Sequence, residues 1–127
     1  MADASPTKAR EQLLMLCITN STLTALHIGS CEISAKGAKA IAEVLKQSST
    51  LKELRIDANS ISDEGAEDLA EALKQNSTLT KLSMSNNSIS DQGAVAIAES
   101  LKQNSALKEL NIGRNSISAE GAKAIAA

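Results

Sequence analysis

Residues 76–93 read NSTLTKLSMSNNSISDQG, and the chain carries nearly the same text once before this stretch and once after it. The earlier copy, residues 48–65, reads SSTLKELRIDANSISDEG, and the later copy, residues 104–121, reads NSALKELNIGRNSISAEG. The copies follow one another at a constant spacing, which is typical of solenoid arrays in which each repeat is one small structural unit. The repeated text therefore predicts one continuous domain built by stacking.

The 28-residue frame divides most of the chain into three full units and one partial unit. These units are residues 21–48, 49–76, 77–104 and 105–127. Residues 1–20 do not fit the frame. Ser5-Pro6 is typical of a helix start, and the apolar residues that follow it predict an amphipathic helix. We expect this segment to form an N-terminal cap over the first repeat.

Each unit changes its hydrophobic period from two residues to three or four. In the second unit, Leu54 and Ile56 are two positions apart, as in a short strand with one buried face. Further along, apolar residues follow the spacing of one helical face; they are Ala66, Leu69, Ala70 and Leu73. Each unit is therefore predicted to contain one strand and one helix.

Several residues predict how the chain turns at the ends of that helix. Ser62 is placed to cap the helix, and Asn76 to end it in the left-handed conformation. The acidic residues between 63 and 71 are interpreted as a solvated helix face. Glycine recurs inside the first helical turn at 37, 65, 93 and 121, which predicts close approach to the neighbouring repeat.

Asparagine occupies the point where the chain leaves the strand in three of the units, at Asn59, Asn87 and Asn115. A buried amide there is expected to satisfy backbone groups that no longer belong to a sheet. Cys31 holds this place in the first unit, where we expect a buried thiol.

The combined pattern, L-x-x-L-x-L-x-x-N-x-I followed by S-x-x-G-A-x-x-L-A-x-x-L, resembles the leucine-rich repeat. Its 28-residue length resembles the ribonuclease-inhibitor-like subclass, which includes the repeats of NOD-like receptors. The resemblance implies an α/β fold: a right-handed solenoid with a short parallel sheet on the concave face and helices on the convex face. That hand also agrees with the general rule for parallel strand crossovers.

The positions between the leucines vary from unit to unit and are expected to face solvent on the concave side. We interpret this varied face as the partner-binding surface. Its candidate residues are His27, Glu53, Arg55, Asp57, Lys81, Ser83, Ser85, Glu109, Asn111 and Arg114.

The helical pattern of the fourth unit runs up to Ala127, whereas solenoids normally carry a polar cap at each end. We expect a chain cut from a longer array, a frayed last repeat, or an open end that pairs with another molecule. The residues predicted for end-to-end contact are Leu107, Leu110, Ile112 and Ile125.

Composition excludes several classes of function. The net charge is −2, and there is no Phe, Tyr or Trp, so no nucleic-acid or membrane binding is expected. Cys17 and Cys31 follow no secretory signal, which predicts free thiols and a cytoplasmic location. The single histidine, His27, is predicted to point away from Cys31, so no metal site is expected. No residues suggest catalysis or a cofactor.

The leading hypothesis is therefore a non-catalytic protein–protein interaction module, which the resemblance connects to ligand sensing, inhibition or scaffolding. One alternative is a short cytoskeletal capping module similar to those of tropomodulins. Another is a minimal or engineered repeat scaffold that self-associates through its C-terminal end.

Overall fold

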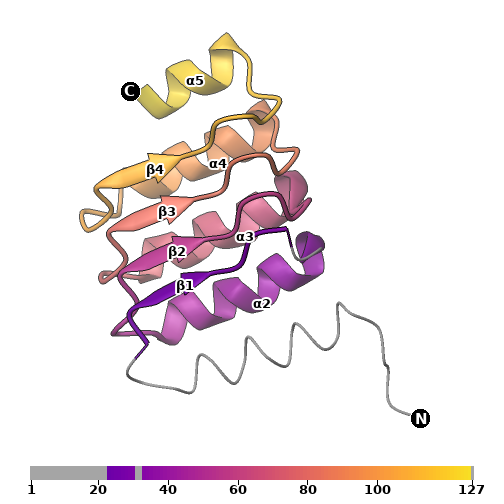
Figure 1. Ribbon diagram of the computed structural model, residues 1–127. Coiled ribbons are helices and arrows are strands. Elements are labelled where there is room, and N and C mark those ends of the chain that lie inside the picture. Colours follow the sequence, from indigo (N-terminus) through magenta and orange to yellow (C-terminus); the bar gives the residue numbers. More distant parts are fainter. Residues whose placement is uncertain (1–22, 31–32, 127) are drawn as a thin grey trace.

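The computed structural model of the protein describes residues 23–30 and 33–126, in which short strands alternate with helices (Figure 1). The predicted N-terminal helix, together with Cys17 and Cys31, lies outside these residues. The elements, in chain order, are β1 (Ala25–His27), α2 (Ser34–Gln47), β2 (Glu53–Arg55), α3 (Ser62–Gln75), β3 (Lys81–Ser83), α4 (Asp91–Leu101), β4 (Glu109–Asn111) and α5 (Ala119–Ala126).

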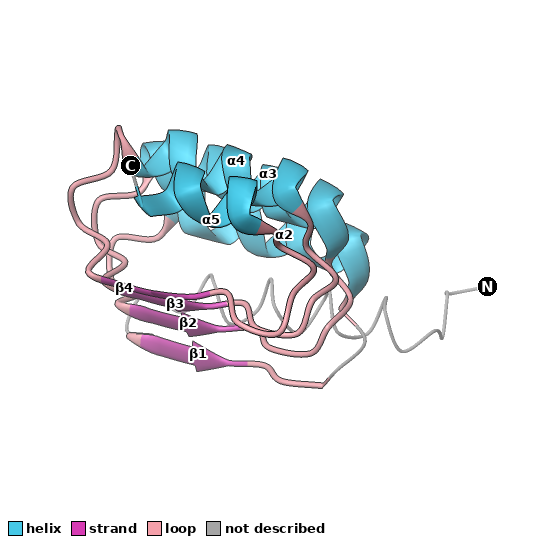
Figure 2. Cartoon of the chain, turned by 90° about the horizontal axis from the view of Figure 1, so that it is seen from above, coloured by secondary structure: helices cyan, strands magenta, loops and turns pink. Residues whose placement is uncertain are grey.

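The strands form one parallel sheet in the order β1-β2-β3-β4. Its register repeats the 28-residue frame, because Leu26 pairs with Leu54, Leu54 with Leu82, and Leu82 with Leu110. The helices pack side by side and cover one face of the sheet, and no described element covers its other face (Figures 1 and 2). The predicted α/β solenoid is confirmed.

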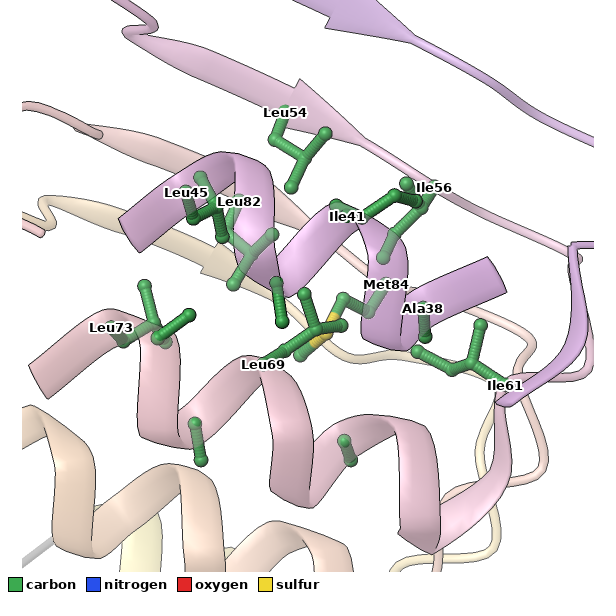
Figure 3. Close-up of a cluster of buried hydrophobic side chains, with 14 of the residues drawn as sticks. Ala38, Ile41, Leu45, Leu54, Ile56, Ile61, Leu69, Leu73, Leu82 and Met84 are labelled. Atoms are coloured by element: carbon green, nitrogen blue, oxygen red, sulfur yellow. The ribbon is translucent and has the colours of Figure 1, made fainter. Parts of the chain in front are cut away.

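The hydrophobic core lies between the sheet and the helices (Figure 3). Leu54 and Ile56 point into it from the second repeat's strand segment, and Leu69 and Leu73 meet them from α3; all four are fully buried. Because each repeat covers the apolar side of the one before it, the core is continuous along the array and no repeat buries its own leucines alone.

The predicted role of the buried asparagines is confirmed. Asn87 accepts hydrogen bonds at its Oδ1 from the backbone N–H groups of Asn59, at 2.7 Å, and Ile61, at 3.5 Å. Its Nδ2 donates to the carbonyls of Ile56, at 3.0 Å, and Ser85, at 3.1 Å. One amide thus completes the turn of its own repeat and that of the preceding one.

The prediction that Ser62 caps α3 is wrong. Helix α3 begins at Ser62 itself, after Ile61 in the cap position, and no side-chain hydrogen bond caps it. Ser62 has a positive φ of 58°. This value lies in the left-handed region, which residues with a side chain disfavour.

Helix α4 is capped instead by an aspartate of the preceding repeat. Asp63 accepts the N–H groups of Ser90, at 2.8 Å, and Gly93, at 2.9 Å. Asp91 does the same for Ser118 at the start of α5. The interpretation of the acidic run as a merely solvated face is therefore wrong at Asp63. Ala35 stands at the corresponding place in the first repeat, so Ser62 has no such carboxylate.

The expectation that Asn76 ends α3 in the left-handed conformation is also wrong. Asn76 is extended, with φ −102° and ψ 131°. Its buried amide instead donates to the carbonyl of Leu45, at 2.7 Å, and accepts the N–H of Leu79, at 2.8 Å. It therefore joins the return turns of two repeats, much as Asn87 does on the opposite side.

The predicted close approach at the helical glycines is confirmed. A β-carbon added at Gly65 would lie 2.9 Å from the β-carbon of Ala38, in the neighbouring helix. One added at Gly93 would lie 3.1 Å from that of Ala66 and closer still to Ile89 of its own turn. Only glycine lets adjacent helices pack at this spacing.

Candidate functional site: the concave face

The open face of the sheet carries a shallow hollow of about 350 Å³. It lies across β2, β3 and β4, whose outward-facing side chains form its polar lining. Seven of the ten predicted concave residues line it: Glu53, Arg55, Asp57, Lys81, Ser83, Glu109 and Asn111. The register of the parallel strands brings them together, since it aligns residues that are one repeat apart.

Glu53 connects the first two strands of the face. Its Oε2 contacts Nε2 of His27 on β1 and lies 3.6 Å from Nε of Arg55. The hydrogen bond with His27 holds the pKa of Glu53 below its ordinary value. His27 thus lies on the concave strand β1 beside Glu53 but does not itself line the hollow.

Asp57 follows β2 and is held by the next repeat. Its Oδ1 accepts the hydroxyl of Ser83 at 2.6 Å, and the N–H and hydroxyl of Ser85 at 2.8 and 2.9 Å. Partial burial pushes the pKa of Asp57 upward, but these hydrogen bonds outweigh it and the pKa falls below its ordinary value. Asp57 is therefore a fixed negative charge, and Ser85 contributes by orienting it.

The third and fourth strands carry an opposite-charge pair. Nζ of Lys81 lies 3.5 Å from Oε2 of Glu109, directly across the strand pairing. Both side chains are more than half exposed, so the pair contributes little to stability. Beside it, Asn111 is exposed and its Oδ1 accepts the N–H of Gly113 at 3.0 Å. These groups can exchange their internal contacts for a partner's at small energetic cost.

Arg114, also predicted for the concave face, does not line this hollow. It lies in the turn after β4 with a φ of 55° and lines a second hollow, at the end of the array. Two of the predicted end-contact residues, Ile112 and Ile125, line that hollow with it. The other two, Leu107 and Leu110, are partly buried and pack against the core.

Sequence reasoning missed how the serines and carboxylates of the face are joined. It placed Asp57, Ser83 and Ser85 on one surface but gave no reason for Asp57 to be fixed. The repeat frame could have predicted this contact, because Asp57 and Ser85 occupy equivalent positions in adjacent repeats. Equivalent positions face each other in a parallel stack.

Among residues 23–30 and 33–126, no cluster of three or more His, Cys, Asp or Glu side chains could hold a metal ion. In the same part of the chain, no helix has the length and apolar character needed to cross a membrane.

Two solved structures illustrate the likeness of this fold to known proteins. The structure titled leiomodin-1 actin-binding site 2 superposes with a TM-score of 0.81 at 23% identity, covering 98% of this chain and 72% of that one. The tropomodulin C-terminal domain of Caenorhabditis elegans gives a TM-score of 0.59 at 14% identity, covering 96% of this chain and 90% of that one. No curated protein sequence matches the chain.

The sequence model of the leucine-rich repeat matches the chain four times, at residues 19–42, 47–70, 75–98 and 103–126. The four matches follow the strand-and-helix units of the structure and together cover most of the chain. The chain therefore belongs to the leucine-rich-repeat family.

Proposed function

We propose that the chain is a non-catalytic protein-binding module and that the concave hollow is its contact surface. The observation that carries the proposal is the difference between the inward and the outward positions of each repeat. The inward positions of the strand segments stay aliphatic or methionine, whereas the outward positions of the strands differ from repeat to repeat and gather on one open face. A scaffold that fixes its interior and varies one surface is suited to recognition.

The chemistry of the hollow favours a protein partner over a small molecule. It is open and lined mainly by polar groups, whereas small-molecule sites are enclosed and mostly apolar. Both charge signs are present on it, with Asp57 fixed and the pair of Lys81 and Glu109 exposed. Such a surface suits a partner whose own surface carries charges of both signs.

Position-specific crosslinking tests this proposal. A photoreactive amino acid replaces Asn111, which lines the hollow, or Val95, which is exposed on α4 in the helix layer. We expect discrete protein adducts in a cell extract from position 111 and not from position 95. Lys81→Glu should reduce these adducts, whereas Lys102→Glu, which also reverses a lysine paired with one glutamate, should leave them unchanged. Identical adducts from both positions would refute the concave surface.

Actin is a specific second candidate as the partner. The likeness to the structure titled leiomodin-1 actin-binding site 2 supports it, and it agrees with the cytoskeletal alternative from the sequence. Fluorescence anisotropy with labelled monomeric actin tests it directly. We expect saturable binding that Lys81→Glu weakens at least tenfold and Lys102→Glu does not. Absence of binding would exclude actin while leaving the crosslinking result to decide the wider proposal.

The finer predictions from the sequence belong to this proposal. They are membership of the ribonuclease-inhibitor-like subclass, a cytoplasmic location, absence of catalysis and self-association through the C-terminal repeat. Each stays a prediction. Sedimentation equilibrium over a range of concentrations tests self-association, since a mass that stays at 13.2 kDa would contradict it.

A further inference from the structure

The concave hollow lies over a short side chain that has longer neighbours on both sides. The strand register places Ser83 between Arg55 on β2 and Asn111 on β4. All three residues line the hollow, together with Asp57. The hydroxyl of Ser83 donates to the carboxylate of Asp57 at 2.6 Å. A partner's side chain that enters the hollow over Ser83 therefore meets this carboxylate.

Asp57 has one carboxylate oxygen that accepts no hydrogen bond from the part of the chain that the structure describes. The three hydrogen bonds that its side chain accepts, from Ser83 and Ser85, all end on Oδ1. An ionised carboxylate has about four acceptor positions, shared between its two oxygens. Oδ2 of Asp57 can therefore accept a donor from a partner while Oδ1 keeps the internal contacts.

Asp57 is also the acidic residue of the hollow that has no ion pair with a described cationic side chain. The lining contains two cationic residues and three acidic ones. Both cations are paired: Nε of Arg55 lies 3.6 Å from Oε2 of Glu53, and Nζ of Lys81 lies 3.5 Å from Oε2 of Glu109. The excess negative charge of the hollow therefore belongs to Asp57.

The residues equivalent to Asp57 in the other repeats are small. Gly29 holds the position in the first repeat, Ser85 in the third and Gly113 in the fourth. A β-carbon added at Gly29 would lie 3.7 Å from the carbonyl oxygen of Asp57, so glycine there keeps the space beside this residue clear of a side chain. Asp57 is accordingly held by its neighbours but only partly buried.

A guanidinium group suits this arrangement better than an ammonium group. It is planar, carries five N–H donors and is more weakly hydrated, so it leaves water more readily to enter a partly buried site. The lining offers it further acceptors in the hydroxyl of Ser83 and the side-chain oxygen of Asn111. A carboxylate that is already fixed also loses little conformational freedom on binding.

We propose that the concave hollow binds an arginine side chain of the protein partner, whose guanidinium group donates to Oδ2 of Asp57. Ser83 and Ser85 act as positioning residues, because their hydrogen bonds to Oδ1 fix the carboxylate. The inference rests on the proposed function, since it names the group by which the concave face holds its partner.

Short peptides test the site without knowledge of the partner. The probe is acetyl-Gly-Arg-Gly-amide, and its matched controls replace the arginine by citrulline, which has nearly the same shape without the charge, or by lysine. NMR titration of the isotopically labelled chain follows the amides of Ser83 and Ser85. We expect saturable shifts at millimolar concentrations of the arginine peptide, with at least tenfold weaker binding of the citrulline peptide and at least threefold weaker binding of the lysine peptide.

Variants of the chain assign the binding to one carboxylate. Asp57→Asn removes the charge but keeps an oxygen that can accept the hydrogen bonds of Ser83 and Ser85, so the fold should persist. We expect it to weaken binding of the arginine peptide at least tenfold. Glu64→Gln removes the same charge from the exposed side of α3 and should leave the affinity unchanged. Glu109→Gln, inside the hollow, should weaken binding less than threefold.

Several results would overturn the proposal. Equal affinity for the arginine and citrulline peptides would show that no charge is recognised, and equal affinity for the arginine and lysine peptides would remove the choice of a guanidinium group. Full affinity in Asp57→Asn would exclude this carboxylate. Equal losses in Asp57→Asn and Glu109→Gln would assign the binding to the general negative charge of the hollow.

Crosslinking from position 111 separates this inference from the proposed function. If its adducts persist unchanged in Asp57→Asn and in excess arginine peptide, the concave contact surface stands and the arginine site is refuted. If the arginine peptide binds at Asp57 but position 111 gives no discrete adducts, the arginine site stands and the proposed function is refuted.

Discussion

The carboxylate of Asp63 caps a helix in the next repeat, where its Oδ1 accepts the N–H of Gly93 at 2.9 Å. The two residues are 30 positions apart, yet this bond acts as a local cap would, because it satisfies a donor in the first turn of α4. Adjacent repeats are therefore joined by polar contacts as well as by their shared core.

Removal of this cap should destabilise the fold. We expect Asp63→Ala to lower the free energy of unfolding by about 1–2 kcal/mol, as for other helix caps. Glu64→Ala is the matched control, since Glu64 lies in the same first turn of α3 and carries the same charge. Urea denaturation followed by circular dichroism measures both. Equal losses in the two variants would attribute the effect to charge near the helix terminus rather than to capping.

The missing cap of α3 can be supplied by design. Ala35 occupies the position equivalent to Asp63, and its Cα lies 3.5 Å from a β-carbon placed on Gly65. The N–H groups of Ser62 and Gly65 now donate to the carbonyls of Asn87 and Ile61. Ala35→Asp should give them a carboxylate acceptor in place of these carbonyls and raise the free energy of unfolding by about 1 kcal/mol. It should also allow Ser62 to leave the left-handed region, as Ser90 does at φ −106°.

The control for this design is Ala35→Ser, whose shorter side chain carries no charge. Chemical denaturation compares the two variants with the parent chain. Stabilisation by serine equal to that by aspartate would show that the carboxylate is not what α3 lacks.

Stability should fall in acid through the same carboxylates. Burial pushes the pKa of Asp63 upward, but hydrogen bonds from Ser90 and Gly93 outweigh it and hold the pKa below the ordinary value of 3.8. Hydrogen bonds from Ser118 likewise lower the pKa of Asp91. A lowered pKa in the folded state gives stability that is present above the unfolded value and lost as the pH falls through the folded one.

We therefore expect the chain to lose stability as the pH falls below about 5, and the variant with Asp63→Asn and Asp91→Asn to lose less over the same range. Urea denaturation at each pH measures the difference. If the free energy of unfolding fell equally with pH in both proteins, Asp63 and Asp91 would not be the source of the acid sensitivity.

The turn after each strand contains a residue in the left-handed region. Ala58 has a φ of 57° and Asn86, its equivalent in the third repeat, a φ of 55°. Asparagine tolerates this conformation better than alanine. We expect Ala58→Asn to stabilise the chain, and Asn86→Ala to destabilise it, each by about 0.5–1 kcal/mol. Thermal and urea denaturation test the pair, and changes of the same sign would argue against a backbone origin.

The buried amide of Asn87 should be hard to replace. Asn87→Ala leaves the N–H groups of Asn59 and Ile61 without their acceptor. The loss should lower the free energy of unfolding by about 2–3 kcal/mol. Asn111 is exposed, and Asn111→Ala should leave that free energy almost unchanged, as is usual for a surface substitution. A similar small effect at both sites, measured by urea denaturation, would mean that water replaces the amide.

Most of the fold could be predicted from the sequence because its determinants are periodic. Leu54 and Leu82 occupy the same place in the frame, and the structure pairs them in the sheet. The predicted concave residues lie mostly on one face for the same reason. Whether they bind a partner is a separate question, which periodicity does not answer.

The errors fell where a contact joins two repeats through a polar side chain. Ser62 and Asn76 were assigned local roles because capping rules consider residues three or four positions apart. The structure shows that Asn76 bonds to Leu45, in the preceding repeat, and that Asp63 acts on α4. Arg114 has the same left-handed φ as Ala58 and Asn86, so its position beside the end hollow follows from its place in the last repeat of the sequence.

The asparagine contacts also set the order in which the repeats can complete their turns during synthesis. The turn at Asn59 and Ile61 is completed by Asn87, which the ribosome adds one full repeat after Asn59. Because domains begin to fold from the N-terminus during synthesis, each turn must wait for the next repeat to emerge before its N–H groups are satisfied. During synthesis, the last repeat with completed turns should therefore be one repeat behind the one that has just emerged. The turn N–H groups of the newest repeat have no acceptor until the next repeat folds.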